Sequence, residues 1–181
     1  MTISTLPASP SGEISHGDVR DKINEVIVDV NSRPVLQYFA SFDKGNLAPS
    51  LLAGTSNLCL FSLITLPSDM VLKQIKFYVN GPIGTDSISA GIYSGNTLLA
   101  SGTATSGSSF VNLTVTQTAL PAGDYWVGIK GVDGTALLGY NPTVLDAALS
   151  QSLVYAPAGL PPNKSGATAD SICPYIELRS F

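Results

Sequence analysis

The side chains that could perform chemistry in this 181-residue chain are few and far apart. The single histidine, His16, would have to serve as the base of a Ser-His-Asp triad or as one ligand of a zinc site, and no second histidine could complete a zinc set. Cys59 and Cys173 are distant in sequence and lie in apolar runs, so we expect two buried thiols. The alternative is a disulfide, which would need an oxidising compartment.

The acidic residues do not form a recognisable catalytic set. Those beyond position 40 are scattered, without the close pair that a glycosidase uses. Asp124 and Asp133 stand at turns, where local backbone hydrogen bonding is the simple role and a loop calcium site is the alternative. Residues 81–84 (GPIG) are a turn without the lysine and helix of a phosphate-binding loop. We therefore expect no enzymatic activity, no metal and no cofactor.

The composition limits the partners. Charged residues make up 12% of the chain, about half the usual share, while hydrophobic residues make up 44%. The net charge of −4 and the pI near 4.7 argue against a nucleic-acid partner. No apolar run reaches the roughly 20 residues that span a membrane. The N-terminus lacks the features of a secretory signal, so we expect synthesis in a cytoplasm and no export by the general secretory route.

One segment, residues 14–33, has a helical pattern. Val19, Ile23, Val26 and Val30 are spaced by four, three and four residues, which is the apolar seam of a coiled coil. A helix of this length is marginal in water, so it needs a partner. The partner is either the rest of the chain or other copies of the same helix. Two heptads cannot hold an oligomer alone, so the remaining domain would have to contribute.

The sequence beyond Pro34 changes to the pattern of an all-β fold. The expected strands are residues 35–42, 58–65, 71–79, 88–93, 97–104, 110–116, 124–130, 135–140, 151–155 and 175–180. Turn residues separate these runs and no helical pattern lies between them, which predicts an antiparallel β-sandwich or jelly roll. We therefore expect an N-terminal arm and helix over 1–34 and a β-sandwich domain over 35–181. Within 71–79, alternation places Val71, Lys73, Ile75 and Phe77 on one face.

Trp126 and the segment 157–170 are the features of this domain that could serve binding. Trp126 is expected to face away from Tyr125, Val127 and Ile129, so it lies in a second layer or is exposed. A core tryptophan is one interpretation, and an aromatic that stacks on a sugar ring or anchors a protein interface is the other. The Pro- and Gly-rich run 157–170 is long for a loop, so it is either functional or packed on a neighbour.

Two segments resemble proteins of tailed-phage virions. The run HGDVRDKINEVI (16–27) resembles the helix that opens many tailed-phage structural proteins. The runs GIY (91–93) and LLAS (98–101), with the later strand from Leu120 to Ile129, resemble a sandwich domain of phage fibre and decoration proteins. The resemblance covers residues 16–30 and 71–130. It implies a trimeric virion appendage without catalytic residues.

These observations lead to one expected function and two alternatives. We expect a virion protein on the head surface, assembled in the host cytoplasm, that decorates or cements the capsid or forms a head fibre. It would bind the major capsid protein or another virion protein as a homotrimer, with Val19, Ile23, Val26 and Val30 at the interface. The first alternative is a short tail fibre or receptor-binding protein whose sandwich binds a host glycan, with Trp126 facing the ligand. The second is a free carbohydrate-binding module.

Overall fold

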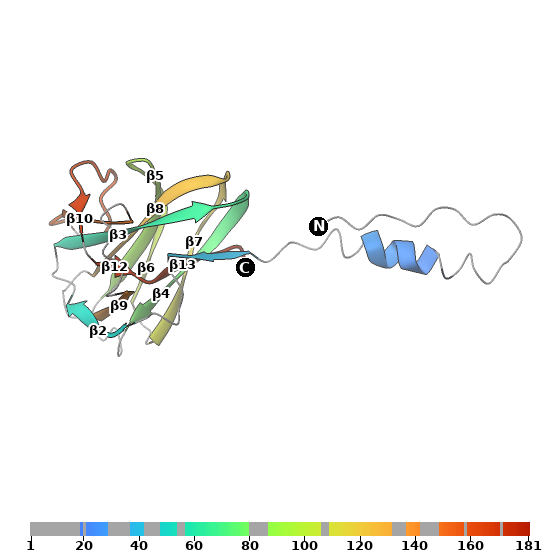
Figure 1. Ribbon diagram of the computed structural model, residues 1–181, viewed down its shortest axis with the longest axis horizontal. Coiled ribbons are helices and arrows are strands. Elements are labelled where there is room, and N and C mark those ends of the chain that lie inside the picture. The colour runs from blue at the N-terminus through green and yellow to red at the C-terminus, as the bar shows by residue number, and fades with distance from the viewer. Residues whose placement is uncertain are drawn as a thin grey trace, which may run out of the picture. The chain divides into compact units, whose positions relative to one another are not determined.

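The computed structural model describes residues 19, 21–28, 37–41, 48–53, 57–79, 87–105, 109–131, 137–141, 149–157, 159–170 and 172–181. The chain divides into two compact units, residues 1–35 and 36–181. In the first unit, residues 19 and 21–28 are helical and lie inside the predicted segment 14–33 (Figure 1). Val30 lies outside the described residues. In the described part of the chain, no helix has the length and apolar character to cross a membrane.

The second unit consists of two antiparallel β-sheets (Figure 1), and this confirms the predicted all-β sandwich. The seven-stranded sheet contains β1 (Tyr38–Ala40), β2 (Ala48–Ala53), β4 (Met70–Val79), β7 (Ser109–Leu120), β9 (Leu137–Asn141), β12 (Cys173–Pro174) and β13 (Ile176–Arg179). The six-stranded sheet contains β3 (Leu58–Leu66), β5 (Ile88–Ser94), β6 (Thr97–Ala104), β8 (Gly123–Gly131), β10 (Ser150–Val154) and β11 (Thr168–Ala169). The jelly-roll alternative stays a prediction.

Each predicted β-segment overlaps a strand, and three strands were not predicted. β2 escaped because its sequence, APSLLA, carries a proline, a residue that sequence reasoning places outside strands. β11 and β12 have two residues each, which is too short for any alternation to be visible. The strands that were missed are thus the two shortest ones and the one whose sequence contains a proline early in the strand.

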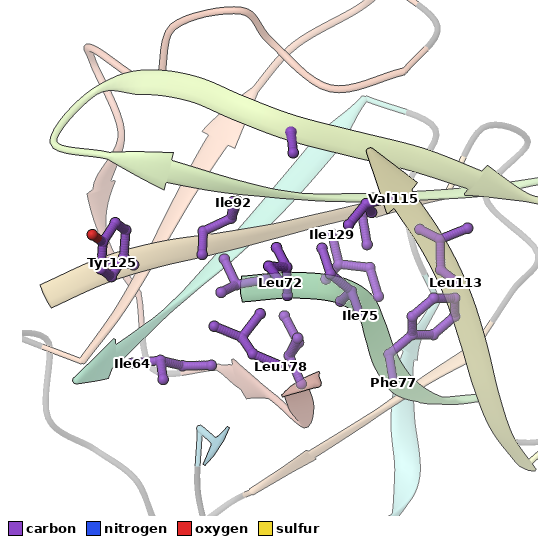
Figure 2. Packing of buried hydrophobic residues seen from close by; sticks show 14 of the residues in the cluster. Ile64, Leu72, Ile75, Phe77, Ile92, Leu113, Val115, Tyr125, Ile129 and Leu178 are labelled. Atoms are coloured by element: carbon purple, nitrogen blue, oxygen red, sulfur yellow. The ribbon is translucent and has the colours of Figure 1, made fainter. Parts of the chain in front are cut away.

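The core lies between the two sheets and is apolar. Its largest cluster takes inward-facing side chains from both sheets, as Figure 2 shows around Leu72, Ile75 and Ile129. Ile75 and Ile129 are at most 1% exposed. Successive side chains of a strand point to opposite faces of its sheet. The strand residues that alternate with these buried side chains therefore lie on the outer faces of the two sheets.

The predicted face of β4 is wrong at its beginning. Leu72 is buried, whereas Val71 and Lys73 are exposed. The cause is a register shift between β4 and β7 at Leu72 and Gln74, which changes the inward parity. Beyond the shift, Ile75 and Phe77 point inward as predicted. The irregularity leaves no mark in the sequence.

Residues near the two ends of the described sandwich are hydrogen-bonded to each other. The Ser180 backbone N–H donates to the Gln37 carbonyl oxygen at 3.0 Å, and the Gln37 N–H donates to Ser180 Oγ at 2.8 Å. β1 and β13 continue this contact as an antiparallel pair. The two ends of the domain therefore lie together at one edge of the seven-stranded sheet.

Candidate functional site

The helix presents its predicted seam to solvent. Val19, Ile23 and Val26 are 58%, 41% and 59% exposed. Together with Ile27 and the stem of Lys22 they line an apolar hollow of about 460 Å³. Lys22 Nζ and Glu25 Oε2 form an exposed ion pair at 2.8 Å, one turn apart. The three described seam residues thus form one apolar surface on the helix.

Trp126 lies on the outer face of the six-stranded sheet. Tyr125, Val127 and Ile129 point into the core cluster, so the predicted opposition of faces is confirmed. Trp126 is in register with Leu63 of β3 and Tyr93 of β5. It belongs to a second apolar cluster, and it is neither between the two sheets nor fully exposed. The second cluster consists of Cys59, Phe61, Tyr93, Leu98, Trp126, Leu153, Leu160 and Ala167.

Two paired glycines form the floor of this second cluster. Gly91 of β5 is in register with Gly128 of β8. A Cβ atom at Gly128 would lie 2.9 Å from the ring of Phe61 and 3.0 Å from the ring of Tyr93. At Gly91 it would lie 2.7 Å from a methyl group of Leu160. These glycines are needed because side chains fill the space directly above the backbone.

Leu160 belongs to a segment, residues 159–167, that we call the strap. The strap lies inside the predicted loop 157–170 and packs on its own sheet. The buried hydroxyl of Tyr93 donates to the Pro161 carbonyl at 2.8 Å. The Leu98 N–H donates to the Pro162 carbonyl at 3.1 Å. A side-chain hydrogen bond and a main-chain hydrogen bond therefore fix the strap to β5 and β6.

Lys164 attaches the strap to Trp126. Its ammonium lies 4.4 Å from the centroid of the indole ring and donates to Gln151 Oε1 at 2.9 Å. The residue is 5% exposed, and burial lowers the pKa of its amino group below the ordinary value. A cation over an aromatic face is favourable, more so when it is desolvated. Lys164 therefore occupies one face of the indole, so a sugar could stack on that face only with the strap displaced.

The two cysteines are buried and free. Cys59 lies in the second cluster, whereas Cys173 Sγ donates to Ser62 Oγ at 3.4 Å. Because Cys59 and Ser62 are three residues apart on β3, they point to opposite faces of the sheet. The two thiols are therefore separated by the sheet, which excludes a disulfide between them in this fold. Burial raises the pKa of Cys59 to about 12 and also raises the pKa of Cys173.

The remaining reactive residues form no catalytic constellation that the structure describes. His16, Asp133 and residues 81–84 lie outside the described residues. Asp124 accepts a hydrogen bond from Thr65 Oγ1 at 2.6 Å, so its partner is a side chain of the neighbouring strand. In the same turn, the Ala122 N–H donates at 2.8 Å to Oδ1 of Asp69, which is distant in sequence. Within the described ranges, no group of three or more His, Cys, Asp or Glu side chains is placed to hold a metal ion.

Neither protein-family models nor curated protein sequences match this chain. The resemblance to phage virion proteins therefore rests on the quoted motifs alone. In the structure, these motifs contribute to the second cluster: GIY supplies Gly91 and Tyr93, and β8 supplies Trp126 and Gly128. Sequence analysis named Trp126 but missed the two glycines as its floor and Lys164 as its cover. The glycines within β-type runs were the available signal.

Proposed function

We propose that this chain is a tailed-phage virion accessory protein of the head surface. It is a decoration, cement or head-fibre protein that attaches through its N-terminal segment and forms a homotrimer. The observation that carries the proposal is the exposed seam of Val19, Ile23 and Val26. The phage assignment itself comes from the sequence resemblance of residues 16–30 and 71–130.

The seam supports association because of its shape and chemistry. β-Branched side chains at alternating spacings of three and four pack knobs-into-holes against other helices. A helix of about ten residues gains too few hydrogen bonds to offset its nucleation cost in water. Burying the seam against copies of itself or another virion protein would supply that missing stability, at about 25 cal/mol for each Å² of apolar surface.

The attachment role also suits the composition. A protein that binds an assembled lattice, and not its free subunits, stabilises the lattice by mass action. Only 12% of the residues are charged, so little charge has to be desolvated where neighbouring copies meet. The seam and the sandwich would then divide the work between attachment and projection.

Sedimentation equilibrium of the full chain tests the oligomer. We expect a trimer at micromolar concentration and a monomer for the double variant Ile23→Asp/Val26→Asp, with the far-UV circular dichroism of the sandwich retained. Val28→Asp is the matched control, since Val28 is 60% exposed on the same helix but lies two residues past a seam position. A monomeric wild-type protein, or equal effects of the seam and control variants, would contradict the trimer.

Copy number tests the location. Quantitative mass spectrometry of purified particles of the virus that encodes this chain should find it in hundreds of copies, as expected for sites on a capsid lattice. A few copies would favour the tail-fibre alternative. Absence from the particle would refute a virion role.

A further inference from the structure

The outer face of the seven-stranded sheet carries a cluster of planar polar and aromatic side chains. The strand register aligns Lys76 of β4 with Asn112 of β7 and Glu177 of β13. In the neighbouring row, Gln74 aligns with Thr114 and Arg179. Tyr78 and Phe110 are paired at one end of these rows. We call this set the β4 face: Gln74, Lys76, Tyr78, Phe110, Asn112, Tyr175, Glu177 and Arg179.

Glu177 organises the charges of the β4 face. Arg179 Nε donates to its Oε1 at 2.6 Å, and Tyr175 Oη donates to its Oε2 at 3.0 Å. Lys76 Nζ lies 3.4 Å from the same Oε2. The Glu177 side chain is 5% exposed, while the side chains of Lys76 and Arg179 retain 14% and 19% exposure. Arg179 therefore uses its Nε for Glu177, and the carbon of its guanidinium lies 5.1 Å from the centroid of the Phe181 ring. The terminal amino groups are the part of the guanidinium that could meet another acceptor.

The aromatic rings are held at fixed angles. Phe110 makes edge-to-face contacts with Tyr78 at 5.0 Å and with Tyr175 at 5.7 Å between ring centroids. Lys76 Nζ lies 4.5 Å from the centroid of Phe110. Both Tyr78 and Phe110 are partly exposed. Rings fixed in this way lose little conformational entropy when a ligand packs against them.

The β4 face has the opposite charge sign to the chain as a whole. Lys76 and Arg179 give the face two positive charges against the one negative charge of Glu177, a net charge of +1. Lys73, exposed on β4 beside Gln74, adds one more positive charge, so the described residues of these strands carry a net charge of +2. The full chain has a net charge of −4. A ligand that seeks this face should therefore be acidic.

We infer that the β4 face binds an acidic saccharide of the uronic-acid class. Gln74, Asn112 and Tyr78 supply hydrogen-bonding groups for ring hydroxyls, and Tyr78 supplies an apolar ring surface. The planar guanidinium of Arg179 matches the planar carboxylate of a uronic acid. A lysine ammonium is a point charge and would not select a planar carboxylate over another anion. Nothing in this inference requires the seam or the trimer, and it uses the sheet opposite to Trp126.

Isothermal titration with an alginate hexasaccharide tests the inference on the full chain. We expect binding that weakens as salt is added, and at least about tenfold weaker affinity for Tyr78→Ala and for Arg179→Gln. Trp126→Phe and Lys164→Met change the other outer face and should alter the affinity by less than about twofold. Thermal unfolding of each variant verifies that the sandwich is folded. If Arg179→Gln unfolds the protein, Tyr78→Ala and Gln74→Ala carry the test.

Three controls make the result decisive. Maltohexaose, a neutral saccharide of equal length, should bind far more weakly, and a glutamate hexamer, which has carboxylates without sugar rings, should not bind. Equal binding of the glutamate hexamer, no binding of alginate, or equal losses on both outer faces would overturn the inference. The Ile23→Asp/Val26→Asp variant should bind the alginate fragment at each β4 face as tightly as wild type, which separates this outcome from failure of the proposed attachment role.

Discussion

Gly91 of β5 lies directly beside Gly128 of β8, and the side chains that occupy the space above this pair include three from separate segments. Phe61 comes from β3, Tyr93 from β5 and Leu160 from the strap. The outer face of the six-stranded sheet thereby gains a small apolar core of its own. Such packing makes the strap part of the folded domain, although its sequence is typical of an irregular loop.

Gly91→Ala should destabilise the protein. The added Cβ would lie 2.7 Å from the Ala100 carbonyl oxygen and 2.7 Å from Leu160 Cδ1, and the backbone oxygen cannot move without disturbing β6. We expect a loss of about 2 kcal/mol in the free energy of unfolding, measured by urea denaturation. Gly131→Ala is the control, since nothing lies within 4 Å of its added Cβ. Equal midpoints for the two variants would show that the strap does not pack on Gly91.

Lys164→Met should change how stability depends on pH. Burial lowers the pKa of the Lys164 ammonium in the folded protein below 10.5. Between the lowered value and 10.5, the unfolded chain binds more protons than the folded chain, so the wild type gains stability as pH rises. The Met variant lacks this gain. From about pH 8 to about pH 10, the denaturation midpoint of the wild type should therefore rise relative to the midpoint of Lys164→Met. Lys130, whose pKa burial also lowers, is present in both proteins and cancels.

Glu177→Gln should weaken the protein at neutral pH and flatten its acid response. Burial alone would raise the pKa of Glu177, but hydrogen bonds from Arg179 and Tyr175 and the charge of Lys76 outweigh burial and lower it below 4.5. The carboxylate thus contributes stability above pH 4.5 that is lost as pH falls through the lowered pKa. We expect about 1–2 kcal/mol of destabilisation at neutral pH, limited by the partial exposure of Lys76 and Arg179.

As pH falls from 4.5 through the lowered pKa of Glu177, the chemical-denaturation midpoints of wild type and Glu177→Gln should approach each other. Asp69→Asn is a suitable comparison, because Asp69 is an exposed acid that makes a single hydrogen bond to the Ala122 N–H. A Gln variant with the full acid sensitivity of wild type would mean that other carboxylates dominate the acid response.

Both thiols should be unreactive in the native protein. Burial raises the pKa of Cys59 to about 12 and raises the pKa of Cys173, so neither is a thiolate near neutral pH. Ellman's reagent at about pH 8 should report no fast-reacting thiol in the folded protein and two per chain in guanidinium. Oxidation of the native protein should leave its mobility in non-reducing electrophoresis unchanged. Rapid labelling of the native protein would contradict the burial of these side chains.

Sequence patterns predicted the layers of the fold better than its details. Alternation in residues 124–130 correctly separated Trp126 from Tyr125 and Val127, because one strand face must meet the core. The same reasoning failed at Val71 and Lys73, since the register shift beside them arises from pairing with β7, which lies far along the chain. Local sequence does not record such a partner.

The surroundings of Trp126 could not be predicted either, because they also depend on segments that are far apart in the sequence. Lys164 comes from a segment with no periodicity, and its position depends on Leu160 meeting Gly91. The β4 face joins β4, β7 and β13, so its three rows exist only once the strand order is known. The sequence therefore allowed single residues to be singled out, whereas the groups that they form could be identified only from the strand order and register of the structure.

The hydrogen bonds between Gln37 and Ser180 have a consequence for the modularity of the sandwich. A domain whose two ends are adjacent can be inserted into a surface loop of an unrelated protein without distorting either protein. The two ends of such a loop are also close together, so they match the ends of the inserted domain. It can also be permuted, with new ends opened elsewhere and a short peptide joining residues 37 and 180. A passenger fused after Phe181 would start beside β1, at the same edge of the seven-stranded sheet.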